Sequence, residues 1–274
     1  MAGFAPFLYA PGHVPPYHML LVKLGGSVIT DKRNYRVLRE EVLDRLAGEI
    51  ASLQERVVIV HGAGSFGHVI ASQHRIQDGY REEEQKMAAS KVMEDVRALN
   101  LAVMSALLRS GLPAVSLPPS VLVRLREGRM ESVDLDVFRR YLDLGIAPVT
   151  FGDVALDLAR GFGICSGDLM MEALARELRP GRIIFCSDVD GVFTSDPAMD
   201  PSARLLEVVD HAMLGSLPRT QRCADVTGSI FGKIETMLRI ASHGESSMVI
   251  NGLVPGRLAA AMRGEEVLGT RVVV

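Results

Sequence analysis

Val57-Val58-Ile59-Val60 runs straight into His61-Gly62-Ala63-Gly64-Ser65-Phe66-Gly67-His68, and this junction is the most informative stretch of the chain. A β-branched run that ends in glycines is typical of a strand followed by a tight turn. Glycine lets backbone N–H groups approach an anion closely, and the start of the helix that follows favours negative charge. A histidine that ends such a loop can add a hydrogen bond or a positive charge to a bound phosphate. The stretch therefore predicts a phosphate site.

The size and charge of the chain narrow its functional class. Its 274 residues, 48% hydrophobic and 23% charged, suffice for one large α/β domain or two closely packed lobes. The formal net charge is −3, the Lys and Arg residues are scattered, and there is no Trp. A nucleic-acid partner is therefore not expected, because such proteins need a basic surface, often with aromatic platforms.

The cysteines and the first residues indicate the cellular compartment. Cys165, Cys186 and Cys223 are odd in number and far apart, which fits neither a disulfide framework nor a zinc site and predicts a reducing cytoplasm. Residues 1–22 lack the positive start of a signal peptide, and prolines interrupt any membrane span. We expect no membrane association, and we expect residues 1–18 to form a poorly ordered extension.

Hydrophobic periodicity predicts strands that alternate with helices along the chain. The expected strands are Met19–Leu24, Val57–Val60, Pro113–Leu117, Ile146–Phe151, Arg182–Cys186, Ser247–Ile250 and Thr270–Val274. The expected helices are a stripe from Leu38 to Leu53, then Glu82–Ser110, Leu135–Leu144, Leu169–Leu178, Ile230–Ser242 and Arg257–Arg263. This alternation predicts a mainly parallel sheet covered on both faces, with ligands and glycine turns at the carboxyl ends of its strands.

Two familiar nucleotide-binding motifs are not present. Gly62, Gly64 and Gly67 match G-x-G-x-x-G, but the acidic residues about 20 positions on open a helix instead of ending a strand, so a Rossmann site is not expected. The segment from Gly228 to Lys233 is one residue too short for a P-loop and lacks the Ser or Thr that should follow the lysine.

Two lysines are candidates for contact with phosphate. Lys23 lies inside an apolar strand just before Gly25-Gly26 and Ser27, where a cation could face transferring phosphate oxygens. The alternative is a solvent-facing lysine on an edge strand. Lys32 is, by itself, an ordinary loop lysine.

Three further turns each have a functional and a structural interpretation. Ser166-Gly167-Asp168 either caps a helix or points Asp168 into a cleft toward nearby lysines. Asp188-Val189-Asp190-Gly191 either holds Mg²⁺ or a ribose, or is a plain Asp-Gly turn. Thr227-Gly228-Ser229 either caps a helix or holds a phosphate, with Lys233 one turn further on. No histidine has a metal-ligand spacing, so no protein-held metal site is expected.

Taken together, these motifs resemble the amino acid kinase family from Met19 to Val274. The resemblance rests on their order along the chain: Lys23-Leu24-Gly25-Gly26-Ser27, His61-Gly62-Ala63-Gly64, Ser166-Gly167-Asp168, Asp188-Val189-Asp190-Gly191-Val192-Phe193-Thr194 and Thr227-Gly228…Lys233. The full loop to His68, the stretch from Val28 to Lys32 and the segment from Tyr141 to Asp157 look like the isopentenyl phosphate kinase branch, whose members are mostly archaeal.

The resemblance implies a fold and an activity. The fold is a three-layer αβα sandwich with a mainly parallel central sheet. The activity is phosphorylation of isopentenyl phosphate by ATP to isopentenyl diphosphate, in the alternative mevalonate route to isoprenoids. Residues 19–178 form the acceptor-binding lobe and residues 179–274 the ATP-binding lobe of one continuous domain, in a cytoplasmic homodimer. Mg²⁺ is expected to arrive with ATP, since two acids in a turn are a weak cage.

The resemblance also implies roles for individual residues. His68 binds the acceptor phosphate, with backbone N–H groups at Ala63, Gly64 and Gly167. Lys23 and Lys32 stabilise charge on the transferring phosphoryl group, and Asp168 orients the lysines. The residues implied at ATP are Lys23, Gly25, Gly26, Ser27, Gly64, Asp188, Asp190, Thr194, Gly228, Ser229 and Lys233.

One departure and two alternatives accompany this interpretation. Ser229 stands where the family pattern has glycine, and its side chain either crowds the phosphates or bonds to them. A fosfomycin-type kinase, or another kinase of a small phosphate or phosphonate, would share the histidine and differ in the pocket for the rest of its substrate. A non-catalytic nucleotide-binding storage or sensor protein would share the fold, but it would not need all of the lysines and Asp168.

Overall fold

The computed structural model describes residues 19–216 and 230–274, and it is built on an eight-stranded sheet of order β12-β14-β13-β9-β1-β2-β6-β3. Strands β13, β9, β1, β2, β6 and β3 run parallel, β14 is antiparallel to β13, and β12 is parallel to β14. The strands are β1 (Met19–Leu24), β2 (Arg56–His61), β3 (Ala114–Ser116), β6 (Ala147–Phe151), β9 (Arg182–Ser187), β12 (Val208–Val209), β13 (Ser246–Asn251) and β14 (Gly269–Val272).

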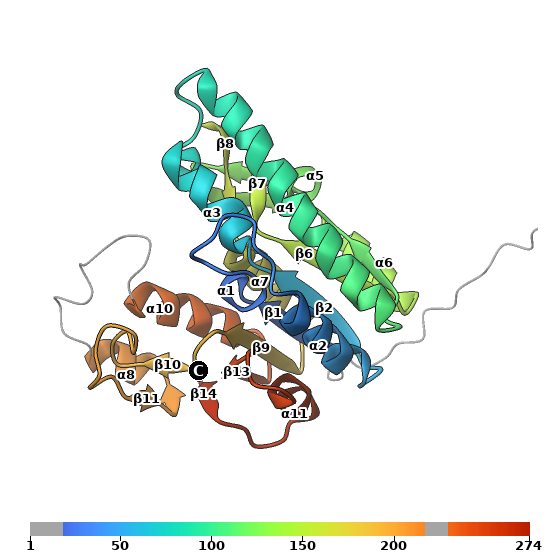
Figure 1. The fold of residues 1–274 in the computed structure, drawn as a ribbon, viewed down its shortest axis with the longest axis vertical. Helices are drawn as coiled ribbons and strands as arrows, with labels where there is room; N and C mark the ends of the chain where they lie inside the picture. Colours follow the sequence, from blue (N-terminus) through green and yellow to red (C-terminus); the bar gives the residue numbers. More distant parts are fainter. Residues whose placement is uncertain (1–18, 217–229) are drawn as a thin grey trace, which may run out of the picture.

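Helices cover both faces of this sheet, which confirms the predicted αβα sandwich (Figure 1). One face packs on α2 (Glu40–Ala51), α4 (Glu84–Arg109) and α11 (Arg257–Arg263), and the other on α6 (Asp136–Asp143), α7 (Gly167–Leu178) and α10 (Ile230–Ala241). In β1, Leu20, Val22 and Leu24 face the first group, while Leu21 faces the second. The alternation of a strand therefore places Lys23 on the α7 side.

A second sheet, absent from the sequence prediction, has the order β5-β4-β7-β8. Its strands are β4 (Val123–Arg126), β5 (Arg129–Val133), β7 (Asp153–Asp157) and β8 (Gly161–Cys165), and only the β4–β7 pair is parallel. In Figure 1, β7 and β8 lie at the end of the molecule away from α10 and α11. The strands are short, and the charged positions of β4 and β5 interrupt any apolar run, so local periodicity does not reveal them.

Other short elements also went unpredicted. They are α1 (Gly26–Ile29), the 3₁₀ turn η2 (Ile76–Asp78), α5 (Pro119–Leu122), β10 (Val192–Phe193), β11 (Leu205–Leu206) and α8 (His211–Ser216), together with β12. The helix start expected after the glycine loop is present as α3 (Gly64–Gln73). Among the predicted elements, the long helix begins at Glu84 instead of Glu82, and the last strand ends at Val272 instead of Val274. Residues 1–18 and the Thr227–Ser229 turn lie outside the described residues.

No helix within the two described ranges has the length and apolar character that a bilayer crossing requires. The sheet itself continues through both halves of the chain, because β9 pairs with β1. The lobe boundary expected after Leu178 coincides with the end of α7, just before the chain enters β9. The assignment of a separate ligand to each lobe stays a prediction.

The turns after β1 and β2 are packed directly against each other. A Cβ on Gly26 would lie 2.4 Å from the amide nitrogen of Gly64, and a Cβ on Gly62 would lie 2.6 Å from the nitrogen of Gly26. Gly64 itself has φ +51°, a conformation that favours glycine. The glycines therefore let two backbones approach where side chains would separate them, which fixes the spacing of the two turns.

His61, the first residue of the glycine motif, belongs to the core. Its ring is fully buried and stacks on Phe151 with 5.0 Å between ring centroids. Its Nδ1 lies 3.1 Å from the Gly62 carbonyl oxygen and its Nε2 lies 3.1 Å from the Asn100 side-chain nitrogen. Burial lowers the pKa of His61 to about 4, so the ring is neutral near pH 7 and has a structural role.

Gly26→Ala is expected to lower the free energy of unfolding by about 1–3 kcal/mol, because a methyl group there forces two backbone turns apart. Gly48→Ala is the matched control: Gly48 lies inside α2 with open space around it, and the change should raise stability by about 0.5–1 kcal/mol. Urea unfolding of both variants measures the difference. Equal stability of the two variants would show that the turns are not closely packed.

Candidate active site

The carboxyl ends of β1, β2 and β9 converge on one edge of the central sheet. The N–H of Gly25 donates to the Cys186 carbonyl oxygen at 3.0 Å, and the N–H of Gly62 donates to the Leu24 carbonyl oxygen at 2.9 Å. These bonds extend the sheet ladder by one residue into each turn. The sheet therefore holds the first residue of each glycine turn in place.

Thr30 connects the same two turns and was not singled out by sequence reasoning. Its hydroxyl donates to the Gly26 carbonyl oxygen at 2.7 Å and accepts from the N–H of Ser65 at 3.0 Å, and the residue is fully buried. A Cβ on Gly64 would lie 2.2 Å from this hydroxyl oxygen. The sequence signal was a threonine after an apolar pair near a glycine turn, which is too common to identify a partner 35 residues away.

Lys23 meets Asp168 in the interior of the site. The Lys23 Nζ lies 2.6 Å from Asp168 Oδ1, and the two side chains are 19% and 44% exposed. Because β1 lies between β9 and β2, the alternative of an edge-strand lysine is wrong. Ser166 caps α7 by accepting from the N–H of Leu169 at 3.2 Å, so the cap and the cleft-facing Asp168 occur together.

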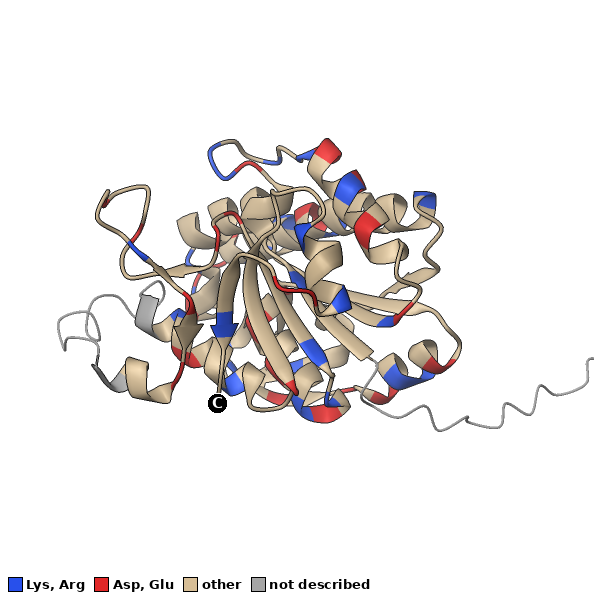
Figure 2. Cartoon of the chain, turned by 90° about the horizontal axis from the view of Figure 1, so that it is seen from below, with Lys and Arg blue, Asp and Glu red and all other residues tan. Residues whose placement is uncertain are grey.

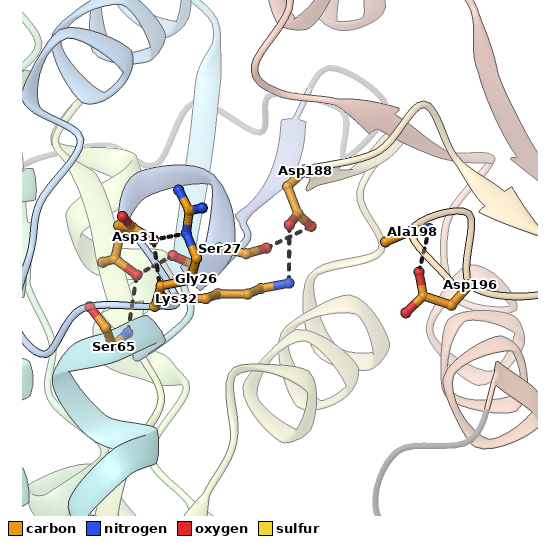
Figure 3. Close-up of polar contacts among 10 residues, drawn as sticks. Gly26, Ser27, Asp31, Lys32, Ser65, Asp188, Asp196 and Ala198 are labelled. Carbon is orange, nitrogen blue, oxygen red and sulfur yellow. Dashed lines mark hydrogen bonds and ion pairs between the residues drawn. The ribbon is translucent and has the colours of Figure 1, made fainter. Parts of the chain in front are cut away.

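Lys32 pairs with Asp188 and not with Asp168. Its Nζ lies 3.0 Å from Asp188 Oδ2, while the Ser27 hydroxyl donates to Asp188 Oδ1 at 2.8 Å. Figure 3 shows Lys32 and Ser27 both pointing toward this carboxylate. Burial alone would raise the pKa of Asp188, but the bonds from Ser27 and Lys32 outweigh it and the pKa is lowered.

His68 lies on the first turns of α3, beside the two lysines. The residue is exposed to solvent. Its pKa is lowered, chiefly because the surrounding protein displaces water from it and then because Lys23 and Lys32 are positively charged. The charges of Lys23 and Lys32 therefore act on His68, which indicates that the three side chains share one site.

The helices α3 and α7 begin side by side at this place. A Cβ on Gly152 would lie 3.4 Å from the nitrogen of Gly167 and 3.8 Å from that of Ala63. Gly167 follows β8 of the small sheet, and α7 then returns to cover the central sheet. Two helix N-termini thus meet, and both favour an anion through their dipoles and their first N–H groups.

Several residues expected at a nucleotide have partners within the protein or lie outside the described residues. Asp190 accepts hydrogen bonds from Arg257 at 2.5 Å and from the Asn251 side chain at 3.2 Å. The Thr194 hydroxyl accepts from the N–H of Arg204 at 3.1 Å. Lys233 is exposed near the start of α10, while Gly228 and Ser229 lie outside the described residues.

Cations and carboxylates at the site are balanced in pairs, and the surface elsewhere is mixed. Figure 2 shows blue and red residues interspersed over the helices and loops. Within residues 19–216 and 230–274, no group of three or more His, Cys, Asp or Glu side chains could hold a metal ion. Two lysines, a histidine and two helix N-termini in one place suit the joining of two phosphate-bearing molecules.

Comparison with known proteins shows the family of the chain. The family model described as the amino acid kinase family matches residues 18–251. An isopentenyl phosphate kinase of Methanothermobacter thermautotrophicus is 41% identical over 263 residues, which cover 93% of this chain and 98% of that protein. One of Thermoplasma acidophilum is 35% identical, with 88% and 94% covered.

The structures agree as well. A crystal structure of isopentenyl phosphate kinase superimposes with a TM-score of 0.81 at 39% identity and covers 93% of this chain and 100% of that one. The chain therefore belongs to the amino acid kinase family.

Proposed function

We propose that the chain transfers the γ-phosphoryl group of ATP to isopentenyl phosphate, forming isopentenyl diphosphate and ADP. The observation that carries the proposal is the meeting of Lys23, Lys32 and His68 with the N-termini of α3 and α7. Relatives that are named isopentenyl phosphate kinase and span nearly the whole chain support this substrate. They favour it over a fosfomycin-type acceptor or a non-catalytic role.

The chemistry of this transfer matches the side chains at the site. The attacking group is a phosphate oxygen that is already an anion, so the reaction needs no general base. The barrier comes from bringing two anions together and from charge spread over the transferring group. Lys23, held inside β1, and Lys32, on the loop after α1, are proposed to neutralise that charge. Asp168 is proposed to orient Lys23.

We propose that one set of residues in the turns at the sheet edge binds the acceptor and another set binds ATP. Ala63, Gly64, Gly167 and His68 bind the acceptor phosphate through N–H groups and the imidazole. On the ATP side the proposed residues are Lys23, Gly25, Gly26, Ser27, Gly64, Asp188, Asp190, Thr194, Gly228, Ser229 and Lys233. Mg²⁺ enters this scheme as part of the MgATP substrate, because phosphate oxygens are ligands that this cation prefers.

An apolar wall beside α3 is proposed to receive the isopentenyl tail. Ala63, at the acceptor end of the site, packs in a hydrophobic cluster with the partly buried side chains of Met93, Phe162 and Ile164. Met87, by contrast, is 76% exposed on α4 and is a weaker candidate for contact with the tail. A five-carbon apolar tail gains from such a wall, whereas a small polar phosphonate does not.

Two finer properties of the family are also proposed for this chain, a homodimeric state and a cytoplasmic location. Cys165 and Cys186 are free and buried, and burial raises the pKa of each thiol to about 12. Unpaired structural thiols of this kind suit a reducing compartment.

The direct test is release of ADP from MgATP with isopentenyl phosphate, with fosfomycin and UMP assayed in parallel. We expect strong turnover with isopentenyl phosphate and at most background turnover with the other two. Turnover with another acceptor would keep the fold and the lysine roles but replace the substrate. No turnover with any of the three would favour the non-catalytic alternative.

His68→Ala is expected to raise the KM for isopentenyl phosphate about 10- to 100-fold, the effect of losing one hydrogen bond to a charged group. The KM for MgATP should change far less, because His68 lies on the acceptor side. His74→Ala, at the far end of α3, is the matched control. An equal loss of affinity for both substrates would contradict the assigned role.

Lys32→Ala is expected to lower kcat about a hundredfold with little change in either KM, because its charge acts mainly on the transition state. Steady-state kinetics with each substrate varied in turn separates the effect on kcat from the effects on the two KM values. Arg33→Ala removes a neighbouring side chain that is 87% exposed and should leave both parameters near wild type. An effect confined to KM would mean that Lys32 only binds substrate.

A further inference from the structure

Lys32 is carried by a loop that is closed at its base. Thr30 and Leu38 form an isolated antiparallel bridge, and the N–H of Asp31 donates to the Val37 carbonyl oxygen at 2.9 Å. At the tip, the Asp31 carboxylate accepts from the N–H of Arg33 at 2.9 Å and from the Asn34 side chain at 3.0 Å. These bonds shape the loop but do not attach its tip to the rest of the protein.

The contact between Lys32 and Asp188 is too weak to hold the loop in place. The Lys32 side chain is 63% exposed, and exposed ion pairs contribute about 0–1 kcal/mol at most. A lysine side chain also has a flexible four-carbon stem, so its position depends on the backbone that carries it. Another contact is needed to place that backbone.

Asp95 on α4 provides this contact. Its carboxylate is fully buried, although nearby buried positions of the helix such as Val92 and Val96 are apolar. The Tyr35 hydroxyl donates to Asp95 Oδ2, and the Arg36 guanidinium lies 3.0 Å from Asp95 Oδ1. Lys91, one turn earlier on α4, lies 2.8 Å from the same oxygen. Two consecutive loop residues thus bind one buried carboxylate.

The partners of Asp95 indicate a strong attachment. A carboxylate without partners is costly to bury, so loss of the loop contacts would leave Asp95 undercompensated. Burial alone would raise the pKa of Asp95, but the bonds from Lys91 and Tyr35 outweigh it and keep the pKa low. Arg36 also lies over the Phe66 ring, 5.8 Å from its centroid, and adopts φ +58°, which an arginine accepts only with compensating contacts.

The same helix supports the acceptor side of the site. A Cβ on Gly67, the residue before His68, would lie 3.1 Å from the Val96 side chain. Val96 is next to Asp95 in sequence, so adjacent residues of α4 support the His68 turn and the Lys32 loop. α4 therefore connects the proposed acceptor-binding group with the proposed charge-neutralising group.

We propose that Tyr35, Arg36 and Asp95 form a clamp that positions Lys32 for phosphoryl transfer. These are positioning residues, since they act through the loop and not on the substrate. The inference rests on the proposed function, because it assigns the clamp an effect on the transfer step. A misplaced catalytic group loses much of its rate while substrate binding persists.

Tyr35→Phe and Asp95→Asn test the clamp through kinetics. Each is expected to lower kcat about tenfold, with less than about a twofold change in the KM of MgATP or isopentenyl phosphate. Tyr141→Phe, on the remote helix α6, is the matched control for loss of a tyrosine hydroxyl and should behave as wild type. Unchanged kcat in both clamp variants would overturn the proposal.

A double-variant cycle separates positioning from general damage. In a Lys32→Ala background, Tyr35→Phe should cause no further loss of kcat, because the group that it positions is already gone. A further tenfold loss would overturn the proposal, since the tyrosine would then act independently of Lys32.

Hydrogen exchange of the amides in residues 31–38 is a readout that needs no substrate. Tyr35→Phe and Asp95→Asn should speed exchange there, while exchange in the core strand β1 stays unchanged. Exchange as slow as in the wild type would overturn the clamp. If the wild type fails to phosphorylate isopentenyl phosphate, the proposed function fails, and exchange still decides whether the clamp holds the loop.

Discussion

The close approach of the turns after β1 and β2 is the constraint on which the site depends. Gly26 and Gly64 bring two backbones to a separation that no side chain permits, and Thr30 links both turns. This packing brings Lys23, on one strand, near the His68 helix, which follows the other. The site is therefore assembled from the rigid ends of strands, and its geometry follows from the sheet.

Charge balance allows two lysines to lie close together in one site. Lys23 is paired with Asp168 and Lys32 with Asp188. Each carboxylate therefore offsets the repulsion between its lysine and the other positive charges of the site. In the proposed reaction, phosphate oxygens would become new partners for both lysines. The carboxylates would keep the lysine side chains in the site while the phosphoryl group moves to the acceptor. Asp168 and Asp188 thus each give one lysine an anionic partner, while the position of the Lys32 backbone depends on the contacts of its loop with Asp95.

Local patterns predicted much of this protein, and long-range pairing accounts for what they missed. Apolar runs ending in glycines correctly predicted the central strands and the turns after β1, β2 and β9, since strand and turn preferences are local. The sequence could not pair Lys32 with Asp188 across 156 positions, nor show that Asp95, within an apolar stripe, is a buried anchor. The short strands of the second sheet were missed because each becomes stable only beside its partners. The ligand roles of Asp190 and Thr194 stay predictions.

The two lysines illustrate different ways to place a charge. Lys23 emerges from a central strand, so hydrogen bonds to β2 and β9 fix its backbone without any dedicated device. Lys32 lies on a loop, and a loop can adapt when two substrates enter or leave. Such freedom is useful only if the loop returns to one position, and a buried carboxylate with two loop partners supplies that position. A site that combines a fixed lysine with a clamped one can admit two substrates and still meet the transferring group accurately.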